Sequence, residues 1–162
     1  MFTLRDHFIQ DIKASGPISL ETYMTRALTD PAHGYYLTRQ PFGQASASGG
    51  DFTTAPEISQ MFGELIGAWC ADLWHRMGQP KRFCLAELGP GRGTLMADVL
   101  RAASVLPEFS AAVQVHFVEV SPALKDLQAE KVPDAIWHQA VTSLPDLPMI
   151  VLANEFFDAL PI

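Results

Sequence analysis

The stretch FCLAELGPGRGTLMADVL, residues 83–100, decides the fold class. It starts with a short apolar run that ends at an acid, Glu87, and continues with three glycines at alternate positions, Gly89, Gly91 and Gly93. The apolar positions after the glycines recur at helical spacing. The stretch therefore predicts a buried strand from Phe83 to Leu88, a tight glycine loop and an amphipathic helix.

Strand and helix patterns continue to alternate after this stretch. Residues 113–120 are rich in β-branched side chains, and Pro122 suits the first turn of a helix. Residues 135–139 indicate a short third strand, and residues 149–154 form a fully apolar fourth one. The segment 105–112, VLPEFSAA, is expected to be a loop between the first of these helices and the second strand.

This alternation predicts an α/β fold. Strands separated by helices pair in parallel with right-handed crossovers, so we expect a Rossmann-like doubly wound parallel sheet. Residues 1–80 would form an N-terminal helical region, and residues 81–162 the first half of the sheet domain. Because such sheets normally have more strands, we expect the C-terminal strands to be absent from this chain and the chain to be a fragment.

The first half of the chain has helical periodicity. One short helix is predicted before Gly16 and a second after Ser19, which can cap it. The segment 53–78 holds the strongest amphipathic pattern, and Thr54 and Glu57 have the spacing of a capping box. Its bulky apolar stripe is expected to face the core and comprises Ile58, Met61, Phe62, Leu65, Ile66, Trp69, Leu73 and Met77.

Composition excludes several classes of function. A hydrophobic fraction of 48% and a charged fraction of 18% are typical of a globular protein, and a net charge of -7 disfavours nucleic acid as a partner. Cys70 and Cys84 lack the spacing of a zinc site or a disulfide framework, so we expect buried thiols in a reducing compartment and no metal. No segment reaches transmembrane length, and the N-terminus lacks an apolar leader, so we expect a cytosolic protein.

Glu87 and the glycine spacing indicate the chemistry of a ligand. In a parallel sheet the ligand crevice lies beyond the carboxyl ends of the strands, where the glycine loop falls. Glycine lets a ligand approach the main chain, and a helix N-terminus favours an anionic group. The spacing E-x-G-x-G-x-G differs from the dinucleotide pattern G-x-G-x-x-G, and the acid would repel a pyrophosphate. It suits a ligand with an ammonium group beside a carboxylate, such as S-adenosylmethionine.

Glu119, at the end of the next strand, fits the other half of this ligand. Two carboxylate oxygens can accept both hydroxyls of an adenosine ribose, as the acid of dinucleotide folds does. Taken alone, Glu119 also reads as a solvent-facing acid at a strand end, and the glycines as a tight turn without a ligand. Because they fall on successive strand ends, we favour the cofactor interpretation.

A third polar group follows the last apolar strand: Asn154, Glu155 and Asp158. As candidate catalytic residues they would hold a nitrogen nucleophile in line with the methyl group of the cofactor. Paired carboxylates also match the guanidinium fork of an arginine acceptor. The alternative is equally open at this point, because Asn is a good N-cap and acids are stabilised in a first helical turn.

Four blocks of the chain together resemble the MidA family of S-adenosylmethionine-dependent methyltransferases: GDFTTAPEISQMFGELIGAW, AELGPGRGTLMADVLR, VHFVEVSPALKDLQ and ANEFFDALPI. The resemblance extends from about His33 to the last residue. Mitochondrial members of this family are assembly factors of respiratory complex I that methylate an arginine of a core subunit. The resemblance therefore implies a parallel sheet of the methyltransferase type, a cofactor lid within residues 1–80, a protein substrate, and the mitochondrial matrix as location in a eukaryote.

The same resemblance implies further cofactor contacts. The block 50–59 would lie against the cofactor as a lid, with Asp51, Phe52 and Thr53 as contacts. Two other classes of function stay open. One is a nicotinamide-dependent oxidoreductase with the same fold, for which the glycine spacing is wrong. The other is a non-enzymatic assembly or chaperone module that keeps the fold for partner binding.

Overall fold

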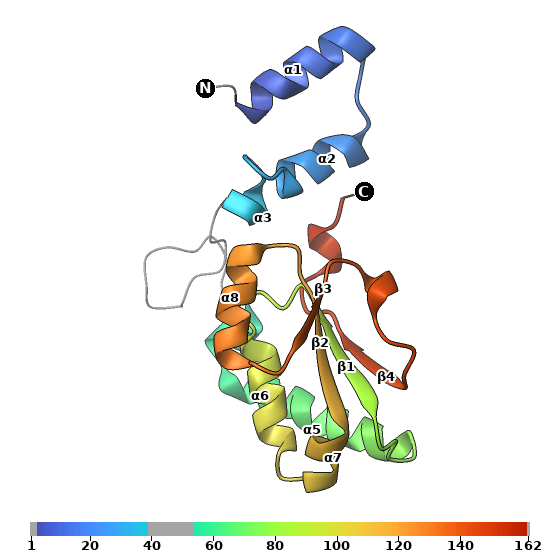
Figure 1. The fold of residues 1–162 in the computed structure, drawn as a ribbon. Coiled ribbons are helices and arrows are strands. Elements are labelled where there is room, and N and C mark those ends of the chain that lie inside the picture. Colours follow the sequence, from blue (N-terminus) through green and yellow to red (C-terminus); the bar gives the residue numbers. More distant parts are fainter. Residues whose placement is uncertain (1–2, 39–53, 162) are drawn as a thin grey trace.

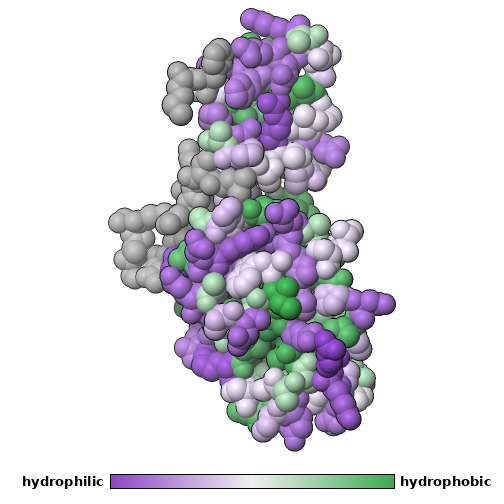
Figure 2. Space-filling view, in the orientation of Figure 1, coloured by the Kyte–Doolittle hydropathy of each residue, from purple (hydrophilic) through white to green (hydrophobic). Residues whose placement is uncertain are grey.

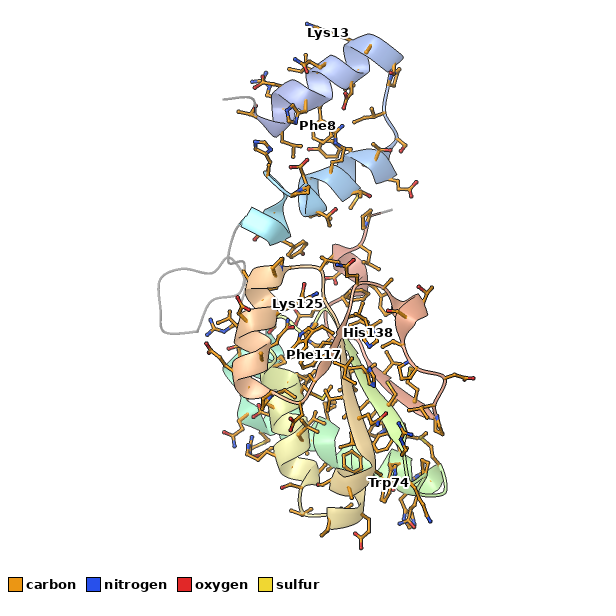
Figure 3. The ribbon with its side chains drawn as sticks, viewed as in Figure 1. Phe8, Lys13, Trp74, Phe117, Lys125 and His138 are labelled. Atoms are coloured by element: carbon orange, nitrogen blue, oxygen red, sulfur yellow. The ribbon has the colours of Figure 1, made fainter. Side chains whose placement is uncertain are left out.

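The structure is a computed structural model that describes residues 3–38 and 54–161. The N-terminal extension is helical, as predicted. Ser19 caps the second helix by accepting a hydrogen bond from the backbone of Thr22. Phe8 packs against Tyr23 between the first two helices, with ring centroids 5.0 Å apart (Figure 3). The helices are α1 (Leu4–Ser15), α2 (Leu20–Thr29) and α3 (Tyr35–Thr38).

The second half of the chain alternates strands and helices. Its elements are, in chain order, β1 (Phe83–Leu88), α6 (Thr94–Ala103), α7 (Pro107–Ala112), β2 (Val113–Val118), α8 (Pro122–Lys131), β3 (Ile136–His138), η1 (Val141–Ser143), β4 (Met149–Leu152) and η2 (Phe157–Ala159). Pro107 starts α7, so the prediction of a loop over residues 105–112 was wrong. A proline fits the first turn of a helix because its missing N–H has no partner there in any case.

The four strands form one parallel sheet in the order β3-β2-β1-β4. The chain proceeds outward from β1 to β3 and then returns to the other side of β1 for β4. This reversal makes the carboxyl ends of β1 and β4 a topological switch point, where open α/β sheets bind their ligands. The predicted parallel α/β sheet is confirmed.

The figures show how the two halves are arranged. α6 and α8 lie along one side of the sheet and the segment with η1 along the other, while α1 and α2 stand beyond the carboxyl ends of the strands, next to η2 (Figure 1). Hydrophilic residues cover most of the N-terminal helices in this orientation, and hydrophobic residues lie among hydrophilic ones on the body that contains the sheet (Figure 2).

The segment 54–78 differs from its prediction. It forms two helices, α4 (Ala55–Ile58) and α5 (Gln60–Arg76), separated at Ser59, which has an extended backbone. Thr54 makes no side-chain capping bond, so the predicted capping box is wrong.

The bulky stripe of α5 does not face the core as a whole. Trp74 is 3% exposed but Trp69 is 51% exposed, and Ile58, Met61 and Leu65 are exposed too. The face that packs against α6 carries small residues instead: a Cβ on Gly67 would lie 2.6 Å from the carbonyl oxygen of Val99. Small side chains let the two helix backbones approach closely. Half of the predicted stripe still packs against the core, namely Phe62, Ile66, Leu73 and Met77, and the other half is exposed.

An aromatic cluster anchors the amino end of the sheet. Phe83 contacts Phe109 with ring centroids 5.1 Å apart, and Trp74, which Figure 3 labels, contacts Phe109 at 5.7 Å; both pairs are edge to face. Such pairs contribute about 0.5–1.5 kcal/mol beyond the burial of their area. Cys70 and Cys84 are buried and free, as predicted.

Candidate functional site

The glycine loop connects β1 to α6 in a conformation that requires its glycines. Gly89, Gly91 and Gly93 have φ values of 61°, 54° and 75°, all in the left-handed region. A Cβ on Gly89 would lie 2.7 Å from Cδ2 of Phe156, so even alanine would displace that ring. Gly93 is the N-cap of α6. The first turn of α6 therefore points its free N–H groups towards the ends of the strands.

Glu87 is the first of the two acids that the sequence singled out. It lies in β1, is 3% exposed, and within the described residues its Oε2 has no hydrogen-bond partner. Burial raises the pKa of Glu87 to about 8. A buried carboxyl with an unpaired oxygen is costly, so its presence indicates a role other than packing.

Glu119 follows β2 directly and is 7% exposed. Its Oε1 accepts a hydrogen bond from the backbone N–H of Ser121 at 2.8 Å, and its Oε2 accepts one from Nε2 of Gln128 at 3.1 Å. Burial raises the pKa of Glu119, and these two hydrogen bonds oppose the shift. The carboxylate is thus held in one orientation at the end of the strand.

Both acids line the same pocket, whose volume is about 540 Å³. Strand pairing brings them there, because Glu87 lies opposite Phe117 in the parallel register and Glu119 comes two residues later on the neighbouring strand. The glycine loop contributes Gly89 and Gly91 to the wall. A pocket of this size is within the usual range for a small-molecule site.

The third polar group also reaches this pocket. Asn154, Glu155 and Asp158 all line it, beyond the end of β4. Asn154 does not cap a helix, since the next helical turn is η2 and its N-cap is Phe156. Glu155 has a φ of 48°, a left-handed conformation that costs a non-glycine residue about 1–2 kcal/mol. Backbone strain of this kind clusters at functional sites.

Other parts of the wall were not predicted from the sequence. Leu28 and Thr29 of α2 and Tyr36 of α3 close the pocket from the N-terminal extension. Burial, and then the charge of Asp158, raises the pKa of Tyr36. No local sequence signal indicates these residues, because they reach the pocket only through the packing of distant segments.

Glu57 also lines the pocket, and the sequence assigned it a different partner. Instead of capping α4, its Oε1 accepts a hydrogen bond from Oγ1 of Thr94, in the first turn of α6, and Lys131 donates to that same hydroxyl. This contact ties α4 to the helix that follows the glycine loop.

Arg92 in the loop lines the pocket as well, and its Nε is buried without a partner among the described residues. Asp51, Phe52 and Thr53, predicted as lid contacts, lie outside the described residues.

Comparison with known proteins identifies the family. Residues 65–162 match the model of a family described as "Putative S-adenosyl-L-methionine-dependent methyltransferase", which covers more than half of the chain. The chain belongs to this methyltransferase family. Its resemblance to the MidA methyltransferases is thereby confirmed.

Relatives of this methyltransferase chain occur in animals. It is 40% identical to the protein arginine methyltransferase NDUFAF7, mitochondrial, of Xenopus laevis, over 98% of this chain and 41% of the relative. It is 43% identical to the NDUFAF7 homolog of Drosophila melanogaster, over 93% of this chain and 39% of the relative. The chain thus spans about two fifths of the length of these curated relatives.

A solved structure supports the same relationship. The fold matches a crystal structure of a superfamily member from Burkholderia thailandensis bound to S-adenosylhomocysteine, with a TM-score of 0.72 and 25% identity. The match covers 97% of this chain and 41% of that one. Within residues 3–38 and 54–161, no helix is long and apolar enough to cross a membrane, and no group of three or more potential ligands is placed to hold a metal ion.

Proposed function

We propose that this chain forms the cofactor-binding part of an S-adenosylmethionine-dependent methyltransferase that modifies an arginine of a protein substrate. The observation that carries the proposal is the pair of buried carboxyls, Glu87 and Glu119, which line one pocket from neighbouring strand ends. Among the described residues Oε2 of Glu87 has no hydrogen-bond partner, whereas Glu119 accepts hydrogen bonds from two donors. This asymmetry suits a ligand with a cation at one end and a diol at the other.

The residues present fit this cofactor. The ionised Glu87 would bind the ammonium group of the methionine moiety, because an opposite charge compensates the burial of the carboxylate. The N-terminus of α6 favours the neighbouring carboxylate of the ligand, and the bare backbone of Gly89 and Gly91 allows its close approach. Glu119 would accept the two ribose hydroxyls. When bound, the cofactor supplies an electrophilic methyl group on a sulfonium.

The acceptor would be held by the residues beyond β4. Asp158 and Glu155 can offer carboxylate oxygens to a guanidinium fork, and Asn154 can accept a further N–H. The chain would increase the rate by aligning the acceptor nitrogen and excluding water, which can lower the activation free energy by about 7–11 kcal/mol. Tyr36, half-buried and close to Asp158, lies where it can close the acceptor side of the pocket. Asp51, Phe52 and Thr53 remain proposed lid contacts within the region 1–80.

The names of the relatives support the choice of acceptor and location. They are called mitochondrial protein arginine methyltransferases. We accordingly propose a protein substrate, reached in the mitochondrial matrix if the source is a eukaryote and in the cytosol otherwise. The resemblance to the MidA family points to a subunit of respiratory complex I as this substrate.

Calorimetric titration tests the cofactor assignment. The purified complete gene product should bind S-adenosylmethionine and S-adenosylhomocysteine and should not bind NAD. Binding of NAD alone would favour an oxidoreductase, and no binding of any of the three would favour an assembly module. For the acceptor, mass spectrometry of complex I subunits from cells with and without the gene should show a lost arginine methylation. An unchanged set of methylated arginines would contradict the proposed substrate.

A further inference from the structure

Gln128 is a polar side chain of α8 that is fully buried behind the glycine loop. Its Oε1 accepts a hydrogen bond from Nε1 of Trp137 at 2.8 Å. Its Nε2 donates to the backbone carbonyl of Gly91 at 2.8 Å and to Oε2 of Glu119 at 3.1 Å. One amide therefore connects the glycine loop, the carboxylate at the end of β2 and the strand β3.

Trp137 decides which way this amide points. An indole N–H can only donate, so the atom that faces it must be the amide oxygen. The NH₂ group must then face Gly91 and Glu119, and each of its two hydrogens has one acceptor. A reversed amide would place its oxygen against a carbonyl and a carboxylate, and two acceptors repel each other. The network thus has a single consistent arrangement.

This arrangement leaves a defined part of Glu119 available. Each oxygen of a carboxylate has about two acceptor sites. Ser121 occupies one site on Oε1 and Gln128 one site on Oε2. Each oxygen has one of these two hydrogen bonds, so both oxygens can still accept from a ligand, and two oxygens of one planar group match two adjacent hydroxyls.

We infer that Gln128 is a positioning residue that sets the selectivity of the pocket for a ribose over a deoxyribose. It fixes the orientation of Glu119 and holds the carbonyl of Gly91 at a constant distance from that carboxylate. Packing alone does not require a glutamine here, because an apolar side chain of similar size would fill the same space without burying an amide. The inference rests on the proposed function, since it assumes that the ligand carries a ribose.

The test compares two ligands. Calorimetry on the complete gene product would measure the affinities for S-adenosylhomocysteine and for its 2′,3′-dideoxy analogue. The wild type should prefer S-adenosylhomocysteine by about tenfold or more, the factor expected for hydrogen bonds to a charged acceptor. Gln128→Leu should lose most of this preference, because binding of S-adenosylhomocysteine weakens by about tenfold whereas the analogue, which has no hydroxyls for Glu119, changes little.

Two further variants complete the design. Gln114→Leu makes the same exchange at the amino end of β2, away from the pocket, and should keep the wild-type preference. Gln128→Met keeps the length of the side chain but has no N–H to donate to Glu119, so it should also lose the preference. It carries the test if Gln128→Leu fails to fold.

The outcomes separate the two proposals. A general loss of structure would lower the affinities for both ligands alike and leave the ratio of the two affinities unchanged. An unchanged ratio in the Gln128 variants would therefore overturn the positioning role. Absence of any binding by the wild type would contradict the proposed function itself. We expect both Gln128 variants to lose the preference for S-adenosylhomocysteine over its analogue and Gln114→Leu to keep it.

Discussion

Replacing Glu87 by glutamine separates what this acid does for stability from what it does for binding. Burial raises its pKa from the ordinary value of 4.5 to about 8. Between these two pH values the unfolded chain has released the proton and the folded chain has kept it, so the folded state is favoured at low pH. The free energy of unfolding therefore falls as the pH rises from about 4.5 towards 8.

The size of this effect follows from the two pKa values. Each pH unit corresponds to about 1.4 kcal/mol, so a titration that extends from 4.5 to about 8 lowers the free energy of unfolding by about 4 kcal/mol at pH 8. Glu87→Gln cannot titrate at this position. The variant should match the wild type at pH 5, where the carboxyl is protonated, and should be more stable than the wild type at pH 8.

The affinity for the cofactor should depend on pH in the opposite direction to the stability. S-adenosylmethionine needs the ionised Glu87, so the wild-type affinity should increase up to about pH 8, whereas Glu87→Gln should bind at least about tenfold more weakly. Urea denaturation at pH 5 and pH 8, with and without S-adenosylhomocysteine, measures both effects. The control is Glu108→Gln, the same exchange at an exposed position of α7. A Glu87→Gln variant that is no more stable than the wild type at pH 8, or that binds with wild-type affinity, would refute the reasoning.

Three further predictions concern the glycine loop, the packing of α5 and the acceptor side of the pocket. Gly89→Ala should lower the free energy of unfolding by about 1–2 kcal/mol, because its φ is left-handed, and should also abolish cofactor binding, because the new Cβ displaces Phe156. Gly78→Ala is the control: its φ is 85° but no atom lies near its Cβ, so thermal melts should show the strain alone. Trp74→Ala should cost about 3–5 kcal/mol in urea denaturation, and Trp69→Ala less than about 1 kcal/mol; equal costs would contradict the observed packing of α5. Asp158→Asn should lower kcat for an arginine peptide by roughly a hundredfold with unchanged affinity for S-adenosylhomocysteine, and a loss of that affinity would place Asp158 with the cofactor instead.

Local patterns predicted the sheet well. The expected strand at the start of the deciding stretch matches β1 in both bounds, because an apolar run followed by a glycine turn is a local signal. The positive φ of all three loop glycines and the meeting of Glu87 with Glu119 follow from the same pattern, since parallel strands place their carboxyl ends at one edge. The roles of these residues remain predictions.

Helix packing was predicted less well. Hydrophobic periodicity gives most weight to bulky residues, and it assigned Trp69 and its neighbours to the core. The contact with α6 instead uses Gly67 and other small residues, since close approach of two helices depends on the absence of side chains. A pattern based on hydrophobicity does not rank glycine as a contact residue.

Long-range contacts of the site were outside the reach of local patterns. The local sequences around Gln128 in α8 and Tyr36 in α3 contain no signal of a site, and both residues acquire their proposed roles through segments that are distant in the chain. Glu57 shows the same limit, because its spacing from Thr54 fits a capping box but its partner in the fold is Thr94. Only the arrangement of α4, α6 and α8 in space reveals that contact.

A structure of the complete gene product with S-adenosylhomocysteine bound would test the central claim most directly. We predict that the amino group of the ligand lies within hydrogen-bonding distance of the Glu87 carboxylate and that both ribose hydroxyls donate to Glu119. A ligand whose amino group and ribose contact neither of these two acids would contradict the account.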